Sequence, residues 1–180
     1  MSELTVGTLS GLAANSYVID VASGSSLDLR NGATLPAGSV LQVVSTNKTD
    51  TYAEAVSSGS FTGIIPGLTA TITPSSATSK ILVWGFCDTI DTVRSLALFR
   101  DTTQISLGDA AGSRKQSHSQ ASAFVFNFLD SPATTSAITY GVKIQGASAT
   151  TIYVNRRSSD TDTGTNARST STITLMEIAG

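Results

Sequence analysis

The chain ends in a run of alternating side chains that is typical of a β-strand. Residues 169–180 read STSTITLMEIAG, so the apolar part of this run stops just before the end of the chain. Chain ends usually fray, and a terminal strand stays ordered only where it is docked inside a sheet. The run at 169–180 must therefore be covered by other strands, either from the same chain or from another copy of it.

Two internal runs are apolar on both faces. In ILVWGFC, residues 81–87, alternation places Leu82, Trp84 and Phe86 on one face of the strand and Ile81, Val83 and Cys87 on the other. In SAFVFNFLD, residues 122–130, it separates Phe124, Phe126 and Phe128 from Val125 and Leu129. A strand that is apolar on both faces is covered on both sides. One sandwich supplies less cover than these strands need, and self-association is the simplest source of the rest.

The composition favours an all-β protein. Charged residues make up 13% of the 180 residues, where about 25% is typical, and Ser and Thr fill most of the deficit. Thr favours strands, while Ser and Gly favour turns. From residue 64 onward, short strands alternate with turns at a spacing that fits an antiparallel jelly-roll sandwich. We expect a hairpin from ITYGVKIQG and TTIYVNRR, joined through GASA, and no helix.

Two parts of the chain differ in the length of their β-prone runs and in their aromatic content. Residues 1–38 consist of short β-prone runs that are poor in aromatic side chains, so they can hardly build a core of their own. We therefore expect a small β-rich anchor or short stalk at residues 1–63 and a jelly-roll head at residues 64–180.

Several classes of function are disfavoured. The net charge is −2 and the four lysines are scattered, which leaves no basic patch for nucleic acid. No apolar run approaches the length of a membrane span. Nucleotide-binding, nucleophile-elbow and zinc-protease motifs do not occur in the sequence. We expect no enzyme, no cofactor and no metal, and we expect the single histidine, His118, to be a solvated loop residue.

Four stretches of the chain together resemble a protein family. They are LTATITPSSATSKILV, ALFRDTTQISLGDAAGSR, FNFLDSPATTSAITYGVKIQG and IYVNRRSSDTDTGTNARSTSTITLMEIA. They are similar to structural proteins of tailed bacteriophages, especially marine and cyanobacterial ones, in which this domain ends a fibre-like virion protein. The family's head looks like the trimeric jelly roll of C1q and tumour necrosis factor.

This resemblance implies a homotrimeric virion component made in the host cytoplasm. It would be a short fibre, a knob or a capsid decoration, attached to other capsid or tail proteins through residues 1–38. The alternative is a host-attachment module that binds a surface glycan or protein through its loops, at residues 108–122 and 155–168. We expect no nucleic acid or membrane partner in either case.

The loop at residues 155–168 holds the candidate ligand-binding residues. They are Asp160, Asp162, Arg156, Arg157 and Arg168. Carboxylates and amides there can bind sugar hydroxyls, with Tyr140 or Tyr153 as an aromatic platform. Oxygen-rich loops can also hold Ca²⁺, although the EF-hand pattern is absent. The third interpretation is that the aspartates and arginines simply form ion pairs with one another.

A second set of residues is predicted to pack in the core or at a trimer interface. It comprises Trp84, Phe86, Phe124, Phe126, Phe128, Ile173 and Leu175. Obligate interfaces resemble a domain core cut in half, so the sequence alone does not divide the set between the two environments.

Overall fold

The computed structural model describes residues 35–90, 93–114, 116–118 and 123–180. These residues form β-strands and no helix, and so they contain no helix that could span a membrane. The strands are β1 (Val40–Lys48), β2 (Tyr52–Val56), β3 (Thr69–Ile72), β4 (Lys80–Ile90), β5 (Val93–Arg100), β6 (Thr103–Ile105), β7 (Ala123–Asp130), β8 (Ile138–Gly146), β9 (Thr150–Val154) and β10 (Ser171–Ile178).

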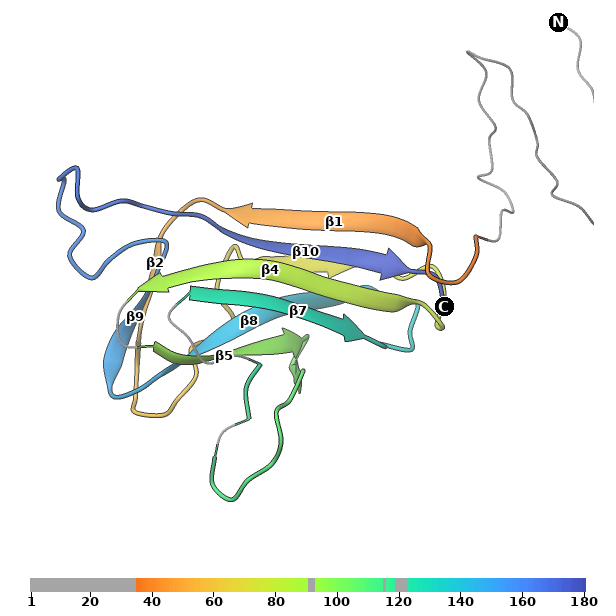
Figure 1. Ribbon diagram of the computed structural model, residues 1–180, viewed down its shortest axis with the longest axis horizontal. Helices are drawn as coiled ribbons and strands as arrows, with labels where there is room; N and C mark the ends of the chain where they lie inside the picture. The colour runs from red at the N-terminus through yellow and green to blue at the C-terminus, as the bar shows by residue number, and fades with distance from the viewer. Residues whose placement is uncertain (1–34, 91–92, 115, 119–122) are drawn as a thin grey trace, which may run out of the picture. The chain divides into compact units, whose positions relative to one another are not determined.

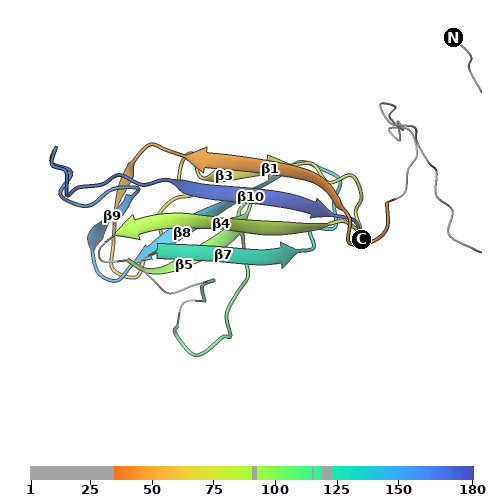
Figure 2. The same ribbon diagram turned by 45° about the horizontal axis from the view of Figure 1, so that its top comes forward.

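The strands form two antiparallel layers, which Figures 1 and 2 show from two directions. One layer has the order β1-β10-β4-β7, and the other has the order β3-β8-β5-β6. The β2–β9 pair continues the first layer, because β9 also pairs with the far end of β4. If β2 and β9 are left out and the other eight strands are renumbered 1 to 8 along the chain, one layer has the order 1-8-3-6 and the other has the order 2-7-4-5. This is the arrangement of a jelly roll. The predicted antiparallel jelly-roll sandwich is confirmed.

The compact sandwich begins before residue 64. Its unit runs from Leu35 to Gly180, and β1 and β2 are hydrogen-bonded members of it. Residues 40–56 of the expected anchor segment therefore belong to the sandwich itself. Residues 1–34 lie outside the described residues, and an anchor role for them stays a prediction.

The expected hairpin of residues 138–157 is wrong. β8 pairs with β3 along one edge and with β5 along the other, so neither edge is left for β9. β9 pairs instead with β2 and with the end of β4. The short segment between β8 and β9 therefore crosses from one layer to the other.

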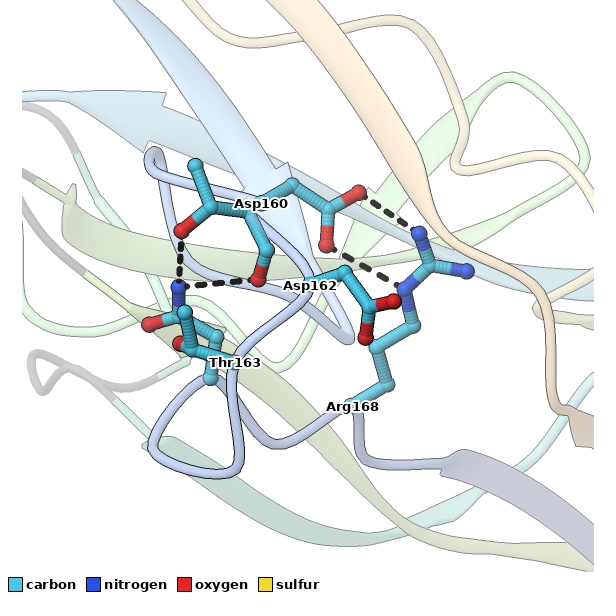
Figure 3. Close-up of a pocket in the computed structure, with 6 residues that line it drawn as sticks. Asp160, Asp162, Thr163 and Arg168 are labelled. Carbon is cyan, nitrogen blue, oxygen red and sulfur yellow. Dashed lines mark hydrogen bonds and ion pairs between the residues drawn. The ribbon is translucent and has the colours of Figure 1, made fainter.

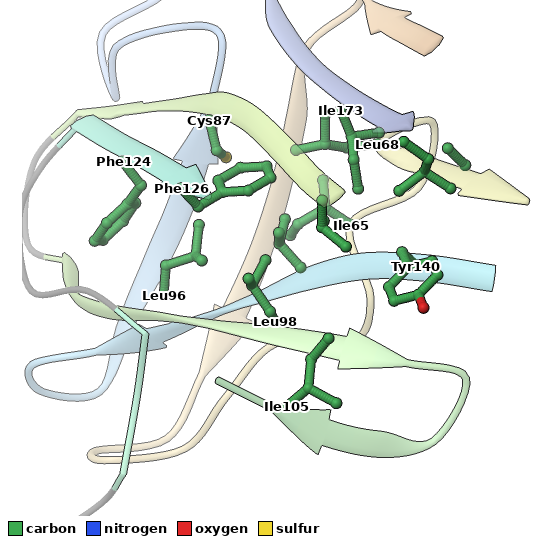
Figure 4. Packing of buried hydrophobic residues seen from close by; sticks show 14 of the residues in the cluster. Ile65, Leu68, Cys87, Leu96, Leu98, Ile105, Phe124, Phe126, Tyr140 and Ile173 are labelled. Carbon is green, nitrogen blue, oxygen red and sulfur yellow. The ribbon is translucent and has the colours of Figure 1, made fainter. Parts of the chain in front are cut away.

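The core lies between the inner faces of the two layers (Figure 4). Phe126 of β7 lies over Gly85 of β4, where an added Cβ would come within 2.6 Å of the phenyl ring and 2.2 Å of the Thr172 carbonyl oxygen. Only glycine allows this close approach of ring and backbone. The alternation predicted for both two-faced runs is confirmed, since Ile81, Val83, Cys87, Phe124 and Phe126 are all buried.

The C-terminal strand is internal to its layer. β10 is hydrogen-bonded to β1 on one side and to β4 on the other, which explains why it does not fray. Ile173 and Leu175 on its inner face are fully buried in the core. Both edges and the inner face are thus covered by the same chain.

Glu177, near the end of β10, is a buried carboxylate with several donors. It is 0% exposed and accepts hydrogen bonds from Gln42 Nε2 at 2.6 Å and from the Ser75 amide and hydroxyl, each at 2.7 Å. Burial favours the neutral acid, but the hydrogen bonds from Gln42 and Ser75 outweigh it and lower the pKa of Glu177. The charged carboxylate thus links β10 to β1 and to the turn before β4.

We predict that Glu177→Gln destabilises the fold near neutral pH by roughly 1–3 kcal/mol, because a side-chain amide presents an N–H to donors that need an acceptor. A lowered pKa in the folded state stabilises the fold above the ordinary value of 4.5, and this stabilisation is lost as the pH falls through the folded-state pKa. Urea unfolding at several pH values should show the difference between variant and parent shrinking as the solution is acidified. An unchanged difference across that range would contradict the role of the charge. Asp162→Asn, on the exposed loop, is the control.

Candidate functional site

The loop at residues 155–170 leaves and rejoins the same edge of β4. The Asn155 amide donates to the Asp88 carbonyl oxygen at 3.0 Å, and the Asp88 amide donates to Ser171 Oγ, also at 3.0 Å. The Ser169 amide donates back to the Asn155 carbonyl oxygen at 3.2 Å. The two ends of the loop are thus held together at its base.

Asn155 is the central residue of this base. It is fully buried, and its φ of 60° lies in the left-handed region that asparagine tolerates better than most residues. Its Nδ2 donates to the carbonyl oxygens of Lys48 and Asp50, each at 2.9 Å, and its Oδ1 accepts from Ser171 Oγ at 2.6 Å. One side chain therefore connects the β1–β2 turn, the loop and β10. No pattern in the sequence predicts this role, because nothing local to Asn155 indicates its partners.

The charged residues of the loop are partly paired. Arg168 donates to Asp160 through Nη2 at 2.7 Å and through Nε at 3.2 Å, and Arg156 Nη1 lies 3.5 Å from the same carboxylate. The hydrogen bonds from Arg168 lower the pKa of Asp160. Arg156 also stacks over Tyr153, with 4.6 Å between its Cζ and the ring centroid. The ion-pair interpretation therefore describes Asp160, Arg156 and Arg168.

The other two predicted residues are not part of this cluster. Asp162 and Arg157 are exposed, and neither forms an ion pair with a described residue. Asp162 instead lines a shallow polar hollow (Figure 3), whose other members are Asp160, Thr161, Thr163, Asn166 and Arg168. Tyr140 is buried in the core, and its hydroxyl donates to Asp130, so it is not a platform for this loop.

The lining of the hollow suits a polar ligand that forms hydrogen bonds better than it suits a metal cation. Ca²⁺ takes six to eight oxygen ligands, and the Asp160 carboxylate is already engaged by Arg168. In the described part of the chain, no three histidine, cysteine or acidic side chains lie close enough to share a metal ion. The Asp162 carboxylate can still accept hydrogen bonds from a polar ligand, and the threonine hydroxyls can donate or accept them.

His118 lies in the loop between β6 and β7, where it is half-buried and contacts its neighbours, so its side chain is only partly solvated. Its Nδ1 lies 2.7 Å from Ser106 Oγ, and its backbone amide donates to the Leu96 carbonyl oxygen at 2.8 Å. Burial lowers the pKa of His118. A serine–histidine pair needs an orienting acid to act as a nucleophilic centre, and the described residues place no carboxylate in hydrogen-bond contact with this ring.

The predicted packing residues fall into two groups. Phe124, Phe126, Ile173 and Leu175 are buried in the core, and Phe128 packs against it. Trp84 and Phe86 lie instead on the outer face of β4, and Trp84 is 50% exposed. Within a single chain Trp84 is therefore not a core residue, because even-numbered positions of β4 point away from the second layer.

The outer face of the β1-β10-β4-β7 layer carries two apolar rows with a mixed row, centred on Trp84, between them. Register places Val43, Met176, Leu82 and Leu129 side by side across the four strands. Two rows further along, Phe86 lies opposite Val125. Trp84 lies between these rows, opposite Thr174 on one side and Asn127 on the other. We call this surface, with Val40 and Ile178 at its end, the outer face.

Charge on the outer face is confined to its two ends. Among the described residues of these four strands, Lys80 and Asp88 are the charged positions that share this side, and they stand at opposite ends of β4. The Asp88 carboxylate accepts a hydrogen bond from Ser169 Oγ. An apolar centre with a polar rim is the usual anatomy of a protein–protein interface.

No protein-family model and no curated protein matches the chain. Among solved structures it is similar to a mutant VP2 protein of infectious bursal disease virus in T=1 particles, with a TM-score of 0.37 and 15% identity over 86% of this chain. A VP2 subviral particle of the same virus gives the same values, and the Gt strain gives 13% identity at a TM-score of 0.37. The matched part covers 39%, 37% and 42% of those chains, so this chain spans about two fifths of their length.

We predict that Asn155→Ala lowers the free energy of unfolding by about 2–3 kcal/mol, because it leaves buried carbonyl and hydroxyl groups unpaired and puts alanine at a positive φ. Asn155→Gly removes the same hydrogen bonds without the conformational penalty, so its loss should be smaller. Chemical denaturation of both variants measures the two contributions separately. Asn166→Ala, whose amide bonds only within the loop, should change stability little. Equal stability of Asn155→Ala and the parent would contradict this account of the loop base.

Proposed function

We propose that the protein is a non-enzymatic structural component of a tailed-phage virion, as a short homotrimeric fibre, knob or capsid decoration. The observation that carries the proposal is the exposed, uncharged apolar outer face, which suits a protein that works in an assembly. The resemblance of residues 64–180 to fibre-like virion proteins supports the same role. Contiguous apolar patches of this kind are uncommon on monomers and mark interaction sites.

The segment before the sandwich is the proposed attachment to other virion proteins. The proposal assigns this role to residues 1–38, most of which precede the compact unit that begins at Leu35. The described sandwich builds its core from residues of the unit Leu35–Gly180.

We predict that the 180-residue chain has a native mass of three times 18.5 kDa, about 55.5 kDa, by light scattering at micromolar concentration. An antibody against the sandwich should also detect the protein in phage particles purified from a lysate of the infected host. A protein that stays monomeric would contradict the homotrimer. Its absence from purified particles would contradict the virion role, whatever its oligomeric state.

A glycan-binding role in host attachment is the second candidate. The observation that favours it is the polar hollow, in which Asp162 faces hydroxyl and amide groups and has no charged partner among the described residues. Sugar hydroxyls suit such groups, and loops on a rigid scaffold commonly carry binding residues. Because Asp160 is held by Arg168, a ligand would depend most on Asp162.

If the second candidate is right, the trimer should bind specific glycans on an array, and Asp162→Ala should abolish the signal. Asp101→Asn, at an exposed aspartate in the turn between β5 and β6 and outside both candidate loops, should leave it unchanged. Silence of the parent protein across the array would contradict glycan binding. Equal loss with both variants would mean that the hollow is not the site.

A further inference from the structure

We infer that the hollow of the loop at residues 155–170 takes an uncharged sugar, which the Asp162 carboxylate selects and for which Arg156 and Tyr153 hold the wall in place. The inference rests on the second candidate of the proposed function, glycan binding, because it names the class of glycan. It concerns the side chains that line the hollow and the two that support its wall from the sandwich.

The hollow has the size and the lining of a small polar binding site. Its volume is about 350 Å³, near the lower end of the roughly 300–1,000 Å³ of ligand pockets. Its lining consists of carboxylate, hydroxyl, amide and guanidinium groups, whereas pockets for drug-like ligands are mostly apolar. A ligand that matches this lining has to form many hydrogen bonds within a small volume, as a sugar ring with its several hydroxyls does.

Two arginines fix the wall of the hollow at Asp160. Arg168 donates to both oxygens of this carboxylate, from Nη2 at 2.7 Å and from Nε at 3.2 Å. Arg156 Nη1 lies 3.5 Å from the same carboxylate, and the Arg156 guanidinium stacks over Tyr153, with 4.6 Å between Cζ and the ring centroid. Because Tyr153 belongs to β9, this stack ties the wall to the sandwich. A wall that is already ordered lowers the entropic cost of binding a ligand.

Asp162 is the lining residue that is left for a ligand (Figure 3). On either side of it, the loop is held by its own hydrogen bonds, since Asn166 Nδ2 donates to Thr161 Oγ1 at 2.7 Å and the Thr163 amide donates to the Thr161 carbonyl oxygen at 2.8 Å. Within the described residues, the Asp162 carboxylate forms no ion pair. It is therefore an acceptor held between two ordered neighbours, and a carboxylate can accept hydrogen bonds from two adjacent hydroxyls.

The charges of the lining favour an uncharged sugar over an acidic one. The lining holds two carboxylates and one guanidinium, and that guanidinium is already paired with Asp160. Arg157 is exposed on the same loop but does not line the hollow. The uncompensated charge that a ligand meets is thus the negative charge of Asp162. It accepts hydrogen bonds from hydroxyls and repels the carboxylate, sulfate or phosphate of an acidic sugar.

Matched pairs of glycans test the charge class. The probe is an array on which each neutral glycan is printed beside the same glycan carrying one sialic acid or one sulfate, and dissociation constants are measured by titrating the 180-residue chain. The neutral member of a pair should bind about tenfold more tightly than its acidic partner. Equal or tighter binding of the acidic members would overturn the inference while leaving glycan binding intact. Silence across all pairs would contradict glycan binding and the inference together.

Asp162→Asn tests the charge of this side chain apart from its shape. The amide keeps the size of the side chain and one acceptor oxygen, so the preference for the neutral member of a pair should fall from about tenfold to about threefold or less. A purely structural role for Asp162 would weaken both members alike, and an unchanged preference would therefore contradict selection by its charge. Asp101→Asn, outside both candidate loops, is the matched control and should keep the preference of the parent.

Conservative and matched variants test the two positioning residues. Tyr153→Phe keeps a ring beneath Arg156 and should bind the neutral glycans as the parent does, whereas Tyr153→Leu removes the stack and should weaken binding several-fold. Arg156→Gln should weaken binding to a similar extent, and Arg157→Gln, at the neighbouring arginine outside the hollow, should not. Circular dichroism checks that each variant folds. Parent-like binding by Arg156→Gln, or an equal loss with Arg157→Gln, would show that Arg156 does not position the wall.

Discussion

The structure depends on β4, which buries one of its apolar faces in the core and turns the other away from it. Its odd-numbered residues enter the core, where the absence of a side chain at Gly85 lets Phe126 approach the strand directly. Its even-numbered residues, Trp84 among them, point to the opposite side. Because β4 is hydrogen-bonded to β10, β7 and β9, every element of the first layer except β1 and β2 is held by it directly. One strand therefore sets both the core and the outer face.

The sequence predicts this alternation well because it is a local property. Successive side chains on a strand point to opposite faces, whatever the strand's partners are. The separation of Phe124 and Phe126 from Val125, and of Val83 from Trp84, could thus be read directly from the order of residues. The composition likewise predicts an all-β chain, and the spacing of turns predicts a jelly-roll sandwich.

Pairing partners and environments could not be predicted in the same way. The hairpin expected for residues 138–157 follows from sequence proximity, but β8 has both edges occupied by strands distant in sequence. Asn155 gains its importance from Lys48, Asp50 and Ser171, which no local pattern brings together. The same limit applies to Trp84, since alternation places it opposite the core residues but does not say what covers it.

The outer face has to meet two opposing requirements. A fully apolar layer would favour non-specific association as soon as the chain folded. Here the row Ser45, Thr174, Trp84 and Asn127 separates two apolar rows and interrupts the patch with polar groups. The hydrogen bond between Ser45 and Thr174 pairs the hydroxyls of that row within the chain, so they do not depend on water. The outer face of the described chain thus combines exposed apolar side chains with polar groups that are already paired.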